Sequence, residues 1–114
     1  MKNLTFFLSI ILMLIVADGC KKPNDYATIC GYVTDKETQE PIKGAMISIQ
    51  AIDNKRVTNE NRVTNEKGYY KFKNLYPRKY NIQVTAHGYI TDRKNDFEAL
   101  TGVPNEVNFQ LEKE

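Results

Sequence analysis

From Ala27 onward, apolar residues repeatedly alternate with polar ones, and this period of two constrains the fold of the chain more than any other feature. Residues 45–52, 80–87 and 106–111 alternate most clearly. Such alternation is typical of a half-buried β-strand, in which successive side chains point to opposite faces of a sheet. Weaker strand signals occur around Ile29 and Val33, around Tyr70 and Phe72, and over residues 89–97. We therefore expect six or seven short strands.

Turn-forming residues separate these segments: Pro41 with Gly44, residues 65–68, residues 74–79 around Pro77, His87 with Gly88, and Gly102 with Pro104. Proline, glycine and asparagine each favour turns through their backbone preferences. No window of about a dozen residues has an amphipathic helical period. The pattern predicts an all-β fold, an antiparallel β-sandwich whose core faces include Ile49 and Val84.

One short repeat interrupts this pattern. The sequence RVTNE occurs at residues 56–60 and again at residues 62–66. A six-residue period is too short for a solenoid unit, whose repeats are 20 residues or longer. We expect a local duplication that lengthens a hairpin loop.

The N-terminal segment predicts export and membrane attachment. Lys2 precedes an apolar run from Leu4 to Ala17, which is shorter than the roughly 20 residues of a membrane-spanning helix and matches a signal h-region. Small residues, Ala17 and Gly19, then precede Cys20, and this arrangement resembles the lipobox of bacterial lipoproteins. The resemblance implies cleavage before Cys20 and acylation of its thiol, palmitate included. The alternatives are an ordinary secretory signal cut near Ala17 or Gly19 and an uncleaved anchor.

These features divide the chain into a signal peptide at residues 1–19, a lipidated N-terminus and tether at 20–26, and one domain at 27–114. The tether is polar and contains Lys21, Lys22 and Pro23. Its lysine pair either contacts anionic headgroups or is simply solvated. The expected location is the bacterial cell envelope, at the outer membrane, with the leaflet left open.

The sequence contains two cysteines. If Cys20 carries lipid, Cys30 is a lone thiol, and a small buried apolar side chain in a strand is its expected role. A disulfide between them requires the lipobox interpretation to be wrong. The formal net charge of +2 and the absence of a basic stripe argue against nucleic acid as a partner.

Five motifs carry a family resemblance. In chain order they are Ile29-x-Gly31-x-Val33-x-Asp35, Thr38-x-x-Pro41-x-x-Gly44-Ala45-x-Ile47, Thr64-Asn65-x-x-Gly68-x-Tyr70-x-Phe72, Leu75-x-Pro77-x-x-Tyr80 and Ala86-x-Gly88-Tyr89. Together they resemble the carboxypeptidase regulatory-like domain. The resemblance implies a seven-stranded Greek-key sandwich of the transthyretin (prealbumin) type. It also implies a folding, docking or binding module without catalytic activity or cofactor.

Candidate catalytic residues are few. His87 is the single histidine, and Ser48 is the single serine after the N-terminal apolar run, so a Ser-His-acid site would need both. We expect His87 to be exposed and idle, and we expect the acidic residues, Asp35 among them, to be solvated. The main functional hypothesis is docking to an envelope protein, for which an edge strand is one mechanism. The alternatives are a carbohydrate-binding surface lipoprotein and a minimal enzyme.

Two binding sites are conceivable from the residues alone. Asp53, Glu60 and Glu66 crowd one loop region with several asparagines, and such oxygen ligands suit a cation. No fixed-spacing metal motif is present, so ordinary turn formation is the competing explanation. Tyr32 and Tyr69 are the candidate contacts for a sugar ring or a protein partner if they point outward. Structural packing is the competing role for both tyrosines.

Overall fold

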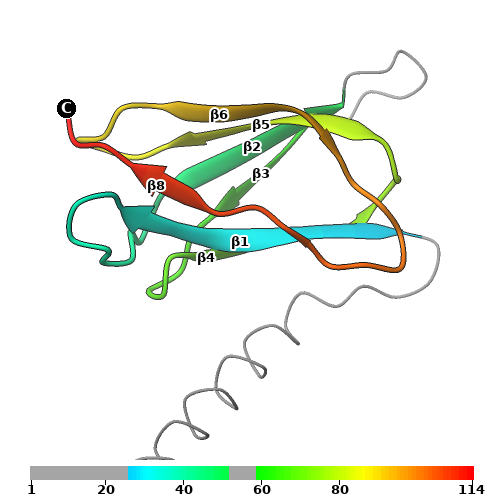
Figure 1. Cartoon of the computed structure of the whole chain (residues 1–114), viewed down its shortest axis with the longest axis horizontal. Coiled ribbons are helices and arrows are strands. Elements are labelled where there is room, and N and C mark those ends of the chain that lie inside the picture. The colour runs from blue at the N-terminus through cyan, green and yellow to red at the C-terminus, as the bar shows by residue number, and fades with distance from the viewer. Residues whose placement is uncertain (1–25, 52–58) are drawn as a thin grey trace, which may run out of the picture.

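Two β-sheets packed face to face form the protein in this computed structural model, which describes residues 26–51 and 59–114 (Figure 1). The expected signal peptide, Cys20 and Asp53 lie outside the described residues. In the described part of the chain, no helix has the length and apolarity needed to cross a bilayer. The strands are β1 (Ala27–Asp35), β2 (Met46–Ala51), β3 (Asn59–Val63), β4 (Tyr69–Leu75), β5 (Lys79–Thr85), β6 (Asp92–Glu98), β7 (Asn105–Glu106) and β8 (Phe109–Leu111).

The first sheet is built around β1, which pairs antiparallel with β4 on one side and parallel with β7 and β8 on the other. The second sheet has the order β3-β2-β5-β6, and all its neighbours are antiparallel. The predicted β-sandwich is therefore confirmed, with one correction: the C-terminal strands pair with β1 in the parallel direction. Taken together, β7 and β8 act as one interrupted strand, so seven strands pair within residues 26–51 and 59–114.

The core lies between the sheets and contains the residues that the alternation placed on inward faces. Ile47 and Ile49 of β2 and Val84 of β5 have no exposed surface, and Ile82 is 1% exposed. Tyr70 and Phe72 of β4 face them from the first sheet, with ring centroids 6.0 Å apart. Because β2 and β5 bury every second side chain, their remaining side chains form the outer face of the second sheet.

A strand that the sequence did not predict, β3, lies at the edge of the second sheet. Its five residues are exposed or partly exposed, so they show no apolar alternation. The RVTNE duplication was expected to form a loop, but residues 59–63 pair with β2. Thr64, in the second copy, is buried; its hydroxyl donates to the Ile42 carbonyl (2.7 Å) and accepts from the Ala45 amide (2.9 Å).

Asp35 was expected to be solvated, and this prediction was wrong. The residue is 4% exposed, and its Oδ1 accepts hydrogen bonds from the amides of Glu37 (2.8 Å) and Thr38 (3.0 Å). Its Oδ2 accepts from the Tyr89 hydroxyl (2.8 Å) and lies 3.6 Å from Lys113 Nζ. The carboxylate thus ties the end of β1 to the turn after β5 and to the C-terminus.

The environment of Asp35 predicts a pH-dependent stability. The hydrogen bond from the Thr38 amide, followed by that from Tyr89, lowers the pKa of Asp35 to about 2, although burial opposes this. In the unfolded chain the pKa of an aspartate is about 3.9. The carboxylate therefore stabilises the fold above about pH 4, and this contribution is lost as the pH falls from about 4 to 2.

Asp35→Asn should accordingly be less stable than the wild type at neutral pH. Denaturant unfolding across the acid range should show a constant stability difference above about pH 4 that shrinks toward pH 2. A difference that stays the same down to pH 2 would show that the charge of Asp35 contributes nothing.

Candidate functional site

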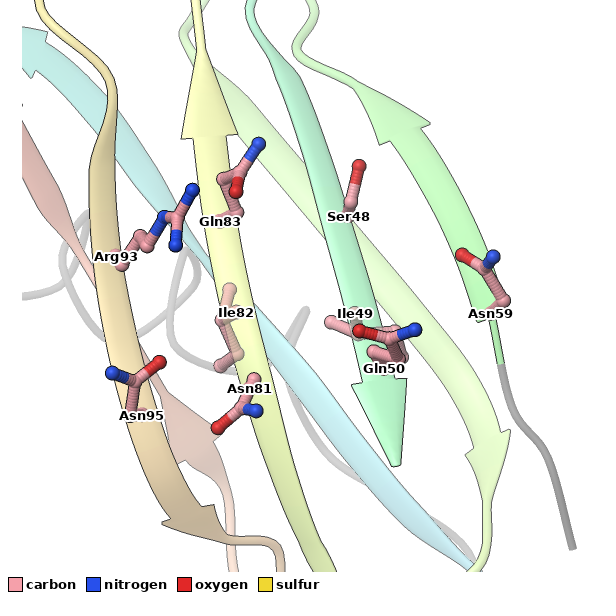
Figure 2. Close-up of a pocket in the computed structure, with 9 residues that line it drawn as sticks. All are labelled: Ser48, Ile49, Gln50, Asn59, Asn81, Ile82, Gln83, Arg93 and Asn95. Atoms are coloured by element: carbon pink, nitrogen blue, oxygen red, sulfur yellow. The ribbon is translucent and has the colours of Figure 1, made fainter. Parts of the chain in front are cut away.

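The outer face of the second sheet carries uncharged polar side chains around a shallow hollow of about 320 Å³ (Figure 2). We call this surface the amide face. It arises because β2 and β5 bury Ile47, Ile49, Ile82 and Val84 and leave mostly polar positions outside, with Met46 at the start of β2 as the exposed apolar exception. Its side chains are Ser48, Gln50, Asn59, Asn81, Gln83, Arg93 and Asn95.

Strand register aligns the amide face into two rows. In the first row, Gln50 lies opposite Asn59 on one side and Asn81 on the other. In the second row, Ser48 lies opposite Gln83, which lies opposite Arg93. Neighbouring strands are about 4.8 Å apart, so side chains within a row are close enough to contact one ligand together.

Most of the hydrogen-bonding capacity of this face is unused within the described part of the chain. Asn81 Oδ1 accepts a hydrogen bond from the Asp96 amide (3.1 Å), next to the irregularity in the pairing of β5 with β6. The side chains of Gln50, Gln83 and Asn95 make no hydrogen bond to another described residue. Each primary amide offers two donors and an acceptor. Among the described residues no carboxylate lines the hollow, so this part of the surface is neutral apart from Arg93.

The structure brings Tyr32 and Tyr69 together on the outer face of the first sheet. They are cross-strand partners in β1 and β4, and their ring centroids lie 5.1 Å apart at an interplanar angle of 54°. Both side chains are half-buried. Burial, with a smaller effect of the Glu106 charge, raises the pKa of Tyr32, and burial is also the main cause of the raised pKa of Tyr69. A ligand-binding role for the pair stays a prediction.

The two described residues proposed for a cation site, Glu60 and Glu66, each lie beside a basic side chain. Glu60 of β3 pairs with Arg62 (3.0 Å), and Glu66, in the turn before β4, lies 4.0 Å from Lys43. No cluster of three or more acidic, histidine or cysteine side chains occurs within residues 26–51 and 59–114. With Asp53 outside the described residues, the structure adds no support to the cation site.

The geometry keeps the two candidate catalytic residues apart. Ser48 lies opposite Gln83 in the sheet, whereas the exposed His87 comes four residues after Gln83 and two residues after the end of β5. The last residue of β5, Thr85, already lies opposite Met46, two residues along β2 from Ser48. The strand pairing therefore does not place Ser48 and His87 opposite each other.

Cys30 is 2% exposed, as predicted for a buried side chain in a strand. The expectation that Cys30 is a lone thiol is not met, however, because no cysteine of the described segments is free. The one other cysteine of the sequence, Cys20, lies outside them. Its sulfur can carry lipid or a disulfide but not both, and lipidation stays a prediction.

The amide face was not predicted as a site. The alternation identified Ser48, Gln50, Asn81 and Gln83 as a solvated face, and the lack of charge among them was the available signal. The sequence could not add Asn59, because β3 was not expected, nor Arg93 and Asn95, because β6 pairs through an irregular register. Strand pairing alone unites these residues.

Comparison with known proteins identifies the domain type. The family model of the carboxypeptidase regulatory-like domain matches residues 28–112. No curated protein sequence matches the chain.

Solved structures with the same fold are distant in sequence. A candidate carbohydrate-binding protein from Bacteroides uniformis has a TM-score of 0.62 and 18% identity, with 77% of this chain and 42% of that chain covered. The TIE protein of Bacillus anthracis has a TM-score of 0.64 and 22% identity, with 79% and 17% covered. Hydroxyquinol 1,2-dioxygenase from Pseudomonas putida has a TM-score of 0.61 and 11% identity, with 83% and 59% covered. The chain therefore spans less than two thirds of each of these proteins, and the likeness concerns the fold alone.

Proposed function

Because the chain belongs to the carboxypeptidase regulatory-like domain family, we propose that it is a non-catalytic binding module of the bacterial cell envelope. In this proposal the sulfur of Cys20 carries a lipid anchor instead of a disulfide, and the amide face binds carbohydrate. The observation that supports the ligand class is the pair of polar rows across four strands, in which Arg93 is the one charged side chain.

The chemistry of the amide face suits sugars for a specific reason. Each sugar hydroxyl both donates and accepts hydrogen bonds, and each primary amide can do the same. The hollow presents several such groups, and none of its lining residues in the described segments is a carboxylate that would favour cations. The core of a protein interface is instead typically rich in aromatic and apolar side chains, and the amide face has neither aromatic residues nor a large apolar area.

Retention of the protein by soluble envelope polysaccharides in affinity electrophoresis tests this proposal. Loss of one hydrogen bond costs about 0.5–1.5 kcal/mol, so Gln50→Ala and Gln83→Ala should each weaken binding by roughly 2- to 10-fold. Gln110→Ala removes the same exposed amide chemistry from β8, on the other sheet, and should leave retention unchanged.

Other outcomes would reassign or refute the site. Retention that survives both glutamine substitutions but is lost in Tyr32→Ala or Tyr69→Ala would place the sugar at the tyrosine pair. Absence of retention by any polysaccharide would contradict carbohydrate binding through either surface.

Protein docking is the second candidate function, and the position of β3 favours it. This strand is the edge of the second sheet, paired with β2 and with no second strand in the described residues. An exposed edge offers backbone hydrogen-bonding groups to a strand of another protein. Absence of polysaccharide retention, together with specific crosslinking of one envelope protein from Asn61, would favour this function over carbohydrate binding.

A further inference from the structure

Exposed apolar side chains gather at the end of the sandwich where β1 begins. Tyr26 and Tyr76 are each 43% exposed, Leu100 is 48% exposed and Val103 is 43% exposed. They come from three segments: the start of β1, the turn between β4 and β5, and the loop between β6 and β7. In Figure 1 this end lies opposite the C-terminus. We call these four side chains the tether-end patch.

Defined contacts hold the patch in place. The rings of Tyr26 and Tyr76 meet edge to face with centroids 6.0 Å apart. The buried Asn105 fixes the loop that carries Leu100: its Oδ1 accepts from the Leu100 amide (3.1 Å), and its Nδ2 donates to the carbonyls of Leu100 and Thr28, both at 2.9 Å. Leu100 and Val103 are therefore exposed on a loop whose backbone is held to β1 by the hydrogen bonds of Asn105.

The charged groups around the patch are mixed. Arg78 lies 5.9 Å from the Tyr76 ring centroid, and Lys79 follows it at the start of β5. Glu98 lies opposite Lys79 in the sheet. Tyrosines with basic neighbours are typical of protein surfaces at the membrane interface, where amphipathic rings sit at the level of the headgroups.

The proposed tether is short enough to determine which end of the domain faces the membrane. Six residues separate Cys20 from Ala27, and the seven Cα–Cα steps between them reach at most about 25 Å. The nine residues of β1 extend about 30 Å away from the tether. The tether is therefore shorter than the strand, so a bilayer holding the Cys20 lipid keeps the end that carries the patch within about 25 Å, whereas the opposite end can lie farther away.

We propose that the tether-end patch rests in the headgroup layer of the membrane, with Tyr26, Tyr76, Leu100 and Val103 as its contacts. This inference depends on the proposed lipid anchor at Cys20. Contact at this end places the strands steeply to the bilayer and directs the C-terminus away from it. The amide face then stands to the side of the domain and remains open to a ligand.

Tryptophan fluorescence can test the contact, because the chain contains no tryptophan. The full lipidated chain is reconstituted in vesicles of phosphatidylethanolamine and phosphatidylglycerol, some of which carry brominated acyl chains that quench fluorescence. Leu100→Trp places the probe in the patch. Ile90→Trp is the matched control, because Ile90 is equally apolar, 51% exposed and bonded to Glu112 at the opposite end.

We expect blue-shifted fluorescence that brominated lipid quenches for Leu100→Trp, and unquenched fluorescence for Ile90→Trp. Both variants should co-sediment with vesicles. Co-sedimentation with Leu100→Trp unquenched would overturn the contact and leave the anchor intact. Equal quenching of both probes would also overturn it, since the domain would then have no fixed end toward the membrane. Failure of both variants to co-sediment would refute the lipid anchor and, with it, the contact.

Discussion

Ile49→Asp is expected to prevent folding. The side chain of Ile49 has no exposed surface, and β2 holds it between Glu60 of β3 and Ile82 of β5 in the middle of the second sheet. Full burial shifts the pKa of a carboxyl by about 3–5 units, which corresponds to about 4–7 kcal/mol. Loss of the isoleucine adds about 1.5–3 kcal/mol. This sum is comparable to the whole stability of a typical domain, about 5–15 kcal/mol.

The measurement is circular dichroism together with denaturant unfolding of the purified variant. Gln50→Asp is the matched control, because it introduces the same charge at the next residue of the same strand but on the exposed face. We expect Gln50→Asp to keep a cooperative unfolding transition and Ile49→Asp to show none. A folded Ile49→Asp protein would mean that the core tolerates water or rearranges around the carboxyl.

Gly31→Ala should cause the second large loss of stability, about 3 kcal/mol or more. An alanine Cβ at this position would lie 1.7 Å from the carbonyl oxygen of Val107, a backbone atom that cannot rotate away. The same carbonyl accepts a hydrogen bond from the buried Tyr70 hydroxyl, and the Val107 amide donates to the Cys30 carbonyl (2.8 Å). Relief of the clash would move β7 and β8 away from β1.

Gly88→Ala is the matched control, because it separates the cost of a steric clash from the cost of an unfavourable backbone conformation. Gly88 has a φ of 83°, and nothing lies within 4 Å of an added Cβ. Its substitution should cost only the strain of a left-handed conformation, about 1–2 kcal/mol. Both substitutions restrict the unfolded chain equally, so the difference in unfolding free energy reports the contact at Gly31. Equal losses in the two variants would show that β7 and β8 adjust to the extra carbon without cost.

Local alternation predicted the core well but failed for strands at the edge. The inward residues of β2 and β5 are buried as expected, because each of these strands has one face toward the core and one toward solvent. β3 has no buried residue to mark it, so its composition looked like a loop. The C-terminal segment was expected to be one strand, but it is interrupted at Val107 and Asn108 beside Gly31.

The candidate sites likewise combine residues that the sequence identified with neighbours that only the strand pairing supplies. Tyr32 and Tyr69 were proposed together as a ligand contact, but only the antiparallel pairing of β1 with β4 makes them neighbours. The polar side chains of β2 and β5 were visible in the sequence as a solvated face. Arg93 and Asn95 join this surface only because β6 pairs with β5, and the exposed residues of β6 show little alternation of their own.

The sequence by itself determined that the domain is all-β and which side chains of its central strands face the core. It could do so because burial on one face of a strand imposes a period of two, whichever strand lies alongside. The tertiary structure alone decided which strands are neighbours, and therefore the rows of the amide face, the buried position of Asp35 and the apolar patch at the tether end. These features depend on contacts between residues far apart in the chain, and local alternation carries no information about such contacts.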